Sequence, residues 1–178
     1  MPESFRSCTF DTAIGDVTVV ASEHGAVAVS TGPRAAVHER LARDLRIVAD
    51  EDAALAAELE PQFDDYFDGE RRRFDIALDW RFVTGFARDA LRAVCGIPYG
   101  ETASYGEIAA AAGRPRAARA VGTACRTTPF SLVVPVHRVV RADGSLGEYG
   151  GNEGLKKYLV ELERRHSGTT GITEGFGG

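Results

Sequence analysis

The hydrophobic pattern of this chain changes near residue 82, and the change restricts the fold to two unlike halves. Residues 1–82 contain short runs of strand-forming apolar residues, separated by turns that contain glycine. Residues 83–166 instead carry apolar residues at helical spacing. A chain of 178 residues is long enough for two small domains with real cores. The pattern therefore predicts an α/β domain followed by a mainly helical domain.

The first half is expected to form a small antiparallel sheet with helices. Helical spacing predicts helices over residues 35–48 and 52–67, and Pro61 should open a second short helix, because proline fits the first helical turn. The expected strands are residues 7–10, 16–21 and 26–30, with 73–79 as a further strand because its apolar and charged residues alternate.

The second half contains two helices at the spacing of a helix-turn-helix. After a helix over residues 85–96, Ser104 and Glu107 form a capping box that starts the next helix. Gly113 should end that helix, and Pro115 should open another that runs to residue 126. An ordinary helical hairpin fits this spacing equally well. The arginines on the second helix favour a DNA-binding motif.

The C-terminal region is expected to hold one more helix and a tail. Asn152 is placed to cap a helix over residues 155–165. Residues 167–178 are small, polar and rich in glycine, so we expect them to be disordered.

Charge is distributed unevenly along the chain. Residues 1–82 hold 17 acids and 9 arginines, whereas residues 83–178 hold 9 acids and 12 lysines and arginines, although the whole chain has a net charge of -5. Residues 108–142 contain six arginines and no acid. A solvated basic surface explains such a stretch, and so does a surface that faces phosphates.

Composition excludes several classes of protein. No apolar run approaches the roughly 20 residues that span a bilayer, and residues 1–12 do not resemble a signal peptide. Cys8, Cys95 and Cys125 are odd in number and widely spaced, which argues against a disulfide framework and a zinc site. We expect a cytoplasmic protein with reduced thiols, associated with the nucleoid if it is prokaryotic.

Residues 133–140 place a histidine and an arginine inside an apolar run. A lone histidine of this kind is more often a satisfied core residue than a catalytic one. The wider sequence changes that interpretation, because five motifs occur in order. These motifs are IPYGET (97–102), SYGEIA (104–109), GRPRAARAVG (113–122), PVHRV (135–139) and GSLGEYGG (144–151).

With these motifs the chain closely resembles the O6-alkylguanine-DNA alkyltransferases, also called methylated-DNA-protein-cysteine methyltransferases. The resemblance implies a ribonuclease-H-like N-terminal domain over residues 1–82 and a winged-helix, helix-turn-helix domain over residues 83–166. It also implies base flipping, in which a damaged guanine leaves the duplex and a cysteine in a P-C-H-R motif takes its alkyl group. It implies no cofactor and no metal, and a monomer.

The resemblance also assigns roles to individual residues. Arg119 resembles the residue that fills the space left by the flipped base, and Tyr105 resembles the residue that rotates the 3' phosphate. His137 and Glu163 resemble the relay that draws a proton from the acceptor thiol. The lesion pocket that the resemblance implies is formed by Tyr105, Val136, Tyr149, Gly150 and Gly151. The DNA-contacting residues that it implies are Tyr105, Arg114, Arg116, Ala118, Arg119, Arg126, Thr128 and Arg138.

Two residues depart from the family pattern. Val136 occupies the position of the acceptor cysteine, and a valine side chain has no nucleophilic atom. Thr128 stands where the family has an asparagine in the hinge, and a hydroxyl lacks the full donor and acceptor set of an amide.

The sequence therefore indicates an alkyltransferase-like lesion sensor, which binds duplex DNA carrying O6-alkylguanine and takes no alkyl group. Excision-repair proteins are the further partners that this subgroup implies. Three alternatives stay open: a transferase that is active through Cys125 or Cys95, a transferase inactivated by engineering, and a DNA-binding regulator that does not recognise lesions. His137 and Glu163 also have the chemistry to activate a water for hydrolysis.

Overall fold

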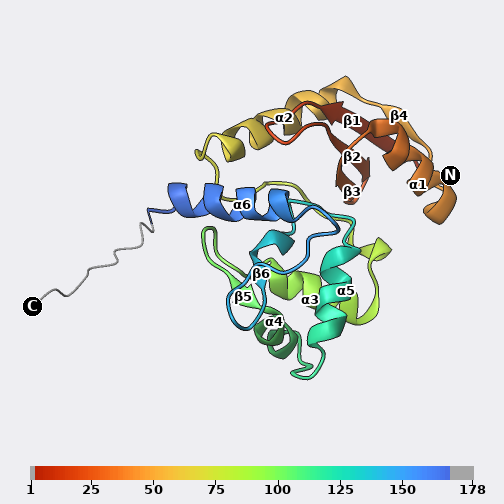
Figure 1. Ribbon diagram of the computed structural model, residues 1–178. Coiled ribbons are helices and arrows are strands. Elements are labelled where there is room, and N and C mark those ends of the chain that lie inside the picture. Colours follow the sequence, from red (N-terminus) through yellow and green to blue (C-terminus); the bar gives the residue numbers. More distant parts are fainter. Residues whose placement is uncertain (1–2, 169–178) are drawn as a thin grey trace, which may run out of the picture.

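The computed structural model describes residues 3–168 and shows two domains with the last helix lying between them (Figure 1). The N-terminal domain contains β1 (Phe5–Phe10), β2 (Val17–Ser22), β3 (Gly25–Thr31), α1 (Arg34–Leu45), β4 (Ala49–Glu51) and α2 (Ala53–Phe67). The C-terminal domain contains α3 (Gly85–Val94), β5 (Ala103–Ser104), α4 (Tyr105–Ala111), α5 (Ala118–Arg126), β6 (Val139–Val140) and α6 (Glu153–His166). Two 3₁₀ turns, η1 (Trp80–Phe82) and η2 (Val136–Arg138), complete the described elements.

The N-terminal sheet is mixed and not purely antiparallel as predicted. Its strand order is β3-β2-β1-β4, and β4 pairs parallel to β1 while the other pairs are antiparallel. The chain reaches β4 through α1, and a crossover of this kind returns the chain to the same end of the sheet, as parallel pairing requires. The expected antiparallel sheet was wrong because the short, polar β4 carries no alternating pattern.

Helix α2 is continuous through Pro61, so the prediction of a second helix at this proline was wrong. Leu55, Leu59 and Phe63 follow one another at a spacing of four residues and pack in the same cluster. This buried face continues on both sides of Pro61. Its packing offsets the roughly 3 kcal/mol that a proline inside a helix costs.

The expected strand over residues 73–79 is reduced to one bridge between Leu78 and Ala26. The N–H of Ala26 donates to Ala77 O at 2.8 Å, and the N–H of Asp79 donates to Ala26 O at 2.8 Å. The backbones approach so closely beside Gly25 that a Cβ there would lie 2.6 Å from Ala77 O. This segment follows the edge of the sheet without extending it.

The helix-turn-helix is present as α4, a short turn and α5. Ser104 and Glu107 form the predicted capping box at the start of α4. Helix α5 begins at Ala118, so the prediction that Pro115 opens it was wrong. Pro115 instead occupies a turn in which the N–H of Ala117 donates to Arg114 O at 2.9 Å. A proline fits the second position of such a turn as well as it fits a helix start.

Helix α6 begins after Asn152, whose side chain accepts from the N–H of Leu155 as predicted. Within residues 3–168, no helix is both long and apolar enough to cross a membrane. Ser167 and Gly168 follow the helix, and the remainder of the predicted tail, residues 169–178, lies outside the described residues.

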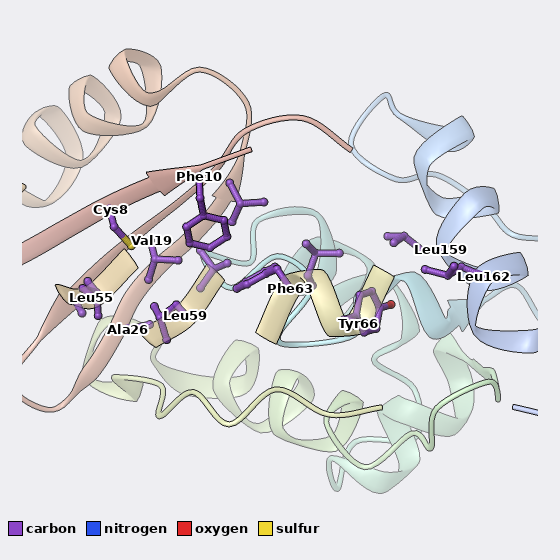
Figure 2. Packing of buried hydrophobic residues seen from close by; sticks show 14 residues of the cluster. Cys8, Phe10, Val19, Ala26, Leu55, Leu59, Phe63, Tyr66, Leu159 and Leu162 are labelled. Atoms are coloured by element: carbon purple, nitrogen blue, oxygen red, sulfur yellow. The ribbon is translucent and has the colours of Figure 1, made fainter. Parts of the chain in front are cut away.

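The two domains share a core. Leu132 from the C-terminal domain and Leu159 and Leu162 from α6 pack in the same cluster as the N-terminal sheet and α2 (Figure 2). The edge strand β3 also pairs with the segment after α5: the N–H of Val29 donates to Pro129 O at 2.7 Å, and the N–H of Ser131 donates to Val29 O at 2.9 Å. The two halves are therefore joined by packing and by backbone hydrogen bonds.

Candidate functional site

A pocket of about 720 Å³ lies where α4, α5, η2 and the loop before α6 meet. Several predicted site residues line it: Tyr105, Ala118, Arg119, Arg126, Thr128, Val136, Tyr149 and Gly150. Gly151, which was expected at the rim, is exposed and is not among the lining residues. The remaining lining residues are Thr31, Gly122, Thr123, Cys125, Ser131, Arg141, Glu148, Asn152 and Leu155.

The arginines of the helix-turn-helix divide into two groups. Arg119 and Arg126 of α5 are exposed and line the pocket. Arg114 and Arg116 lie exposed in the turn before α5, and the Arg114 guanidinium stacks over the Phe86 ring at 5.2 Å from its centroid. All four arginines are exposed on α5 or in the turn before it. This part of the domain therefore carries positive charge, as a surface that binds phosphates does.

Arg138 does not belong with these arginines, and its assignment as a DNA contact was wrong. Its side chain is buried, donates to both carboxylate oxygens of Glu163 at 2.8 and 2.9 Å, and donates to Ile97 O at 2.6 Å. A buried arginine pairs with the buried carboxylate next to it, since leaving either charge unpaired is costly. The basic stretch in the sequence therefore contains one internal ion pair.

Two tyrosines form walls of the pocket. Tyr105 lies at the start of α4, where Gly122 of α5 packs close to it: a Cβ on Gly122 would lie 3.8 Å from the ring. Burial raises the pKa values of Tyr105 and Tyr149 above the ordinary value for tyrosine. Both side chains therefore stay protonated at neutral pH and are able to donate a hydrogen bond.

Val136 and His137 lie side by side in η2, and both are buried. His137 contacts Glu163 of α6, with 2.7 Å between Nε2 and Oε1. Burial raises the pKa of Glu163, but the hydrogen bonds from His137 and Arg138 outweigh burial and hold that pKa well below its usual range. Glu163 is thus a carboxylate, and His137 Nε2 donates to it.

The two nitrogens of His137 have different surroundings. Burial lowers the pKa of His137, which favours the neutral ring, although the Glu163 hydrogen bond acts in the opposite direction. In the neutral ring with Nε2–H, the Nδ1 atom is the acceptor. Within residues 3–168, Nδ1 is buried and has no hydrogen-bond partner. The structure therefore brings the predicted relay residues His137 and Glu163 together and leaves Nδ1 of His137 as a buried acceptor.

Thr128 occupies the hinge between α5 and the pocket floor. Its hydroxyl accepts from the N–H of Phe130 at 3.1 Å, so it retains one of the hydrogen bonds that a polar hinge side chain is able to make. Leu132, four residues on, is buried with φ at 69°, which is strained for a residue with a branched side chain. The pairing of residues 129 and 131 with β3 holds this strained segment in place.

The three cysteines differ in environment. Cys8 is buried in the sheet, and burial raises its pKa to about 11. Cys95 is exposed and follows the last turn of α3, where the helix ends. Cys125 lines the pocket, and burial raises its pKa to about 12, which keeps the thiol protonated.

One exposed group offers ligand atoms for a metal ion. Glu3, Glu23 and His24 place such atoms within 4.8 Å of one another on the N-terminal domain. Glu3 already pairs with Arg81 at 2.5 Å, and exposed acidic residues of this kind are common without a metal. The group contains no pocket-lining residue.

Some residues at the site were not found from the sequence. Thr31 lies at the end of β3, and Tyr66 of α2 donates to Glu163 Oε1 at 2.7 Å, so both reach the site from the other domain. Lys156 is buried under the Tyr105 ring and donates to Val139 O at 2.5 Å. The sequence contained a signal for Lys156, because this lysine lies on the apolar face of α6. A lysine buried on such a face needs a hydrogen-bond partner.

Comparisons with known proteins agree with this geometry. A sequence profile described as "6-O-methylguanine DNA methyltransferase, DNA binding domain" matches residues 85–165, and one described as "6-O-methylguanine DNA methyltransferase, ribonuclease-like domain" matches residues 6–80. A methylated-DNA-protein-cysteine methyltransferase of Mycolicibacterium paratuberculosis is 53% identical over 114 residues, which are 64% of this chain and 68% of that protein.

Solved structures have the same architecture. The crystal structure of Mycobacterium tuberculosis O6-methylguanine methyltransferase aligns with a TM-score of 0.76 at 36% identity, over 91% of this chain and 94% of that one. The crystal structure of Mycobacterium tuberculosis OGT in complex with DNA aligns with a TM-score of 0.73 at 36% identity, over 92% and 94% of the two chains. This chain therefore belongs to the 6-O-methylguanine DNA methyltransferase family of DNA-repair alkyltransferases, and it has that family's DNA-binding domain.

Proposed function

We propose that this protein binds duplex DNA that carries O6-alkylguanine, holds the flipped base in the pocket, and accepts no alkyl group. The observation that carries the proposal is that Val136 lines the pocket and precedes His137 in η2. The resemblance of residues 135–138 to the P-C-H-R motif assigns Val136 to the place of the acceptor cysteine. A valine has no lone pair and no ionisable proton, so no bond to an alkyl carbon forms there.

The pocket supports base recognition. Its volume of about 720 Å³ lies in the range of small-molecule sites, and its walls combine two tyrosine rings with polar and charged side chains. Tyrosines that stay protonated are suited to stack on a base or donate to it. Arg119 on α5 lines the same pocket, so an arginine is available to occupy the space that an extruded base leaves.

DNA binding is supported by α5 and by the relatives. One of the aligned structures is described as a complex with DNA, and this chain matches 94% of it. The net negative charge of the whole chain does not oppose this, because residues 108–142 carry six arginines and no acid. Lesion sensing would couple this binding to excision-repair proteins, which would recognise the complex.

A methyltransferase that uses another thiol is the second candidate, and Cys125 favours it because it lines the pocket. The pKa of about 12 opposes it: at pH 7 only about one thiol in 100,000 is ionised. The thiolate is the nucleophile, so transfer to Cys125 would be slow unless the bound base changed the surroundings of the thiol.

The proposal is tested by binding to two duplexes that differ in one O6-methyl group. Fluorescence anisotropy at a fixed, stated salt concentration should give a dissociation constant at least about 10-fold lower for the lesion duplex, which corresponds to about 1.4 kcal/mol. A third duplex with an abasic site controls for a general preference for weakened stacking. Equal affinity for the methylated and unmethylated duplexes would contradict lesion recognition and favour a DNA-binding regulator.

A further inference from the structure

Tyr66 reaches from the N-terminal domain into the His137–Glu163 pair. It lies near the C-terminal end of α2, on the side of the shared cluster where Leu159 and Leu162 of α6 lie (Figure 2). Its hydroxyl oxygen is 2.7 Å from Glu163 Oε1 and 3.5 Å from His137 Nε2. Tyr66 is only 1% exposed, and neither His137 nor Glu163 exceeds that value. A side chain from one domain thus enters a buried network of the other.

The directions of these hydrogen bonds follow from charge. Glu163 is ionised, because hydrogen bonds from His137 and Arg138 outweigh the effect of burial on its pKa. Burial and the Glu163 charge raise the pKa of Tyr66 well above the ordinary value, so its hydroxyl keeps its proton. Tyr66 and His137 Nε2 therefore both donate to the same oxygen, Glu163 Oε1.

Arg138 Nη2 also donates to Oε1, at 2.9 Å, so three donors share this oxygen and each hydrogen bond is weaker than it would be alone. The negative charge on Oε1 would stabilise a protonated His137 ring. The hydrogen bond from Tyr66 reduces the part of this charge that acts on the ring. Arg138 takes much of the remaining charge through Nε and Nη2. The arrangement favours a neutral His137 with the proton on Nε2, and it leaves Nδ1 as an acceptor without a partner in the described chain.

We propose that Tyr66 is a positioning residue for His137: by donating to Glu163 Oε1, it holds His137 as the neutral Nε2–H tautomer and leaves the buried Nδ1 as a hydrogen-bond acceptor. The N-terminal domain thereby sets the protonation state of a residue in the DNA-binding domain. This inference does not depend on which base the pocket holds, so its test is independent of lesion binding.

The charged and titratable groups around His137 decide the sign of the effect. Burial lowers the pKa of His137, Glu163 raises it, and Arg138 and Lys156 lower it. Tyr66 on α2 acts through its hydrogen bond to Glu163. Besides burial, the Glu163 charge also raises the pKa values of Tyr99 and Tyr149. Removing the Tyr66 hydroxyl leaves more of the Oε1 charge for the imidazole, so the pKa of His137 should rise.

The experiment compares the full-length protein with its Tyr66→Phe variant by ¹⁵N NMR of the histidine rings over a pH series, with His137 assigned by a His137→Gln variant. In the unsubstituted protein, His137 should be the Nε2–H tautomer with a titration midpoint below 6.5. In Tyr66→Phe, the midpoint should move to higher pH. The phenylalanine ring retains the packing of the tyrosine against Phe67 and Phe74, so the fold should persist.

Tyr99→Phe is the matched control. The Tyr99 ring packs edge-on against Tyr66, with 6.1 Å between the ring centroids, and its hydroxyl is buried without a hydrogen-bond partner in residues 3–168. Its loss should leave the His137 midpoint unchanged. An unchanged midpoint in Tyr66→Phe, or the same upward shift in both variants, would overturn the assignment.

A measurement without substitution keeps the inference testable if Tyr66→Phe does not fold. A buried hydroxyl that donates to a carboxylate exchanges slowly with water, so the Tyr66 hydroxyl proton should give a resolved resonance with a cross-peak to the His137 ring. A rapidly exchanging Tyr66 hydroxyl, or a His137 ring that carries its proton on Nδ1, would contradict the proposal.

Discussion

Among single residues, Val136 decides whether the pocket is able to accept an alkyl group, because its side chain has no nucleophilic atom and no hydrogen-bonding atom. Tyr105, Arg119, Thr128 and Tyr149 all line the pocket with polar groups, whereas Val136 offers only methyl groups beside His137. The surrounding network is nevertheless intact, from His137 to Glu163. A thiol introduced at this position tests whether the rest of the site supports transfer.

Val136→Cys should acquire one methyl group from duplex DNA that carries O6-methylguanine. Cysteine is slightly smaller than valine, so the packing cost should be about 1 kcal/mol, and His137 Nδ1 is available to draw on the thiol proton through a water. Peptide mapping by mass spectrometry should place the methyl on residue 136. Adding His137→Ala should slow the reaction at least about 10-fold.

Val134→Cys controls for a thiol that is merely nearby. Val134 is buried two residues before Val136 and is not a pocket-lining residue, so its thiol should gain no methyl group. A Val136→Cys variant that folds and binds the lesion but stays unmethylated would show that the pocket no longer presents the alkyl carbon to this position.

Glu163 is the residue whose loss should most affect stability. It is 1% exposed and accepts from Tyr66, His137, Arg138 and the N–H of Gly100. Glu163→Gln should lower the free energy of unfolding at pH 7 by about 3–5 kcal/mol, because it leaves the Arg138 charge buried and unpaired. Urea denaturation measures this loss, with Glu161→Gln as the control. Glu161 is exposed and pairs loosely with Lys157 at 3.8 Å, so its substitution should change the free energy of unfolding much less.

The same carboxylate predicts a pH dependence. The folded-state pKa of Glu163 lies well below its unfolded value of about 4.3, so its contribution to stability is fully present above that pH and is lost as the pH falls from there toward the folded-state pKa. His137 acts in the same direction below about pH 6.5, because the unfolded ring takes up a proton that the folded ring resists. Between pH 4 and pH 2, Glu163→Gln should therefore lose less stability than the unsubstituted protein, and an equal loss would contradict this.

At the scale of elements, sequence predicted α4 and its cap closely and the start of α5 less well. The side chains of Ser104 and Glu107 accept hydrogen bonds from the free N–H groups of the helix start. This local pattern made the capping box predictable from the sequence. Pro115 suits two local structures, and only the tertiary packing of α3 against α5 decides between them. Similarly, β4 and the continuity of α2 depend on long-range contacts that no local pattern encodes.

The arginines of the helix-turn-helix should separate in their effects on DNA binding. Arg119→Ala should reduce the preference for the lesion duplex, because Arg119 lines the pocket. Arg116→Ala should weaken binding to lesion and normal duplexes alike and reduce the salt dependence by about one phosphate contact, because Arg116 is exposed in the turn. Arg165→Ala, on the exposed last turn of α6, is the control. Unchanged affinity and salt dependence in both test variants would remove the helix-turn-helix from the DNA interface.

At the scale of the whole molecule, the contact between the domains is what sequence could not predict. Tyr66 and Glu163 are 97 residues apart, and Val29 pairs with residues a hundred positions further along the chain. The charge division near residue 82 indicated two separate halves, whereas Leu132, Leu159 and Leu162 place the C-terminal half inside the N-terminal cluster. The family motifs predicted the pocket because most of its lining residues lie in a few short segments. The residues of the N-terminal domain that contact the site are scattered along the sequence.

The shared core predicts that the two domains unfold together. Thermal or urea unfolding followed by far-UV circular dichroism, near-UV circular dichroism and Trp80 fluorescence should give one coincident transition. Trp80 lies at the junction and packs against Phe130 at 5.3 Å between ring centroids, so it reports on both domains. Two separated transitions would show that the domains are independent.

The central claim, that the lesion is bound and not repaired, is tested most directly by the intact mass of the protein. The chain should be incubated with a slight excess of O6-methylguanine duplex at a concentration where binding is measured to be complete, and then analysed by mass spectrometry. We expect no gain in protein mass and unchanged O6-methylguanine in the recovered DNA, because Val136 offers no nucleophile and the Cys125 thiol stays protonated. A stoichiometric gain of one methyl group, on Cys125 or either other cysteine, would contradict it.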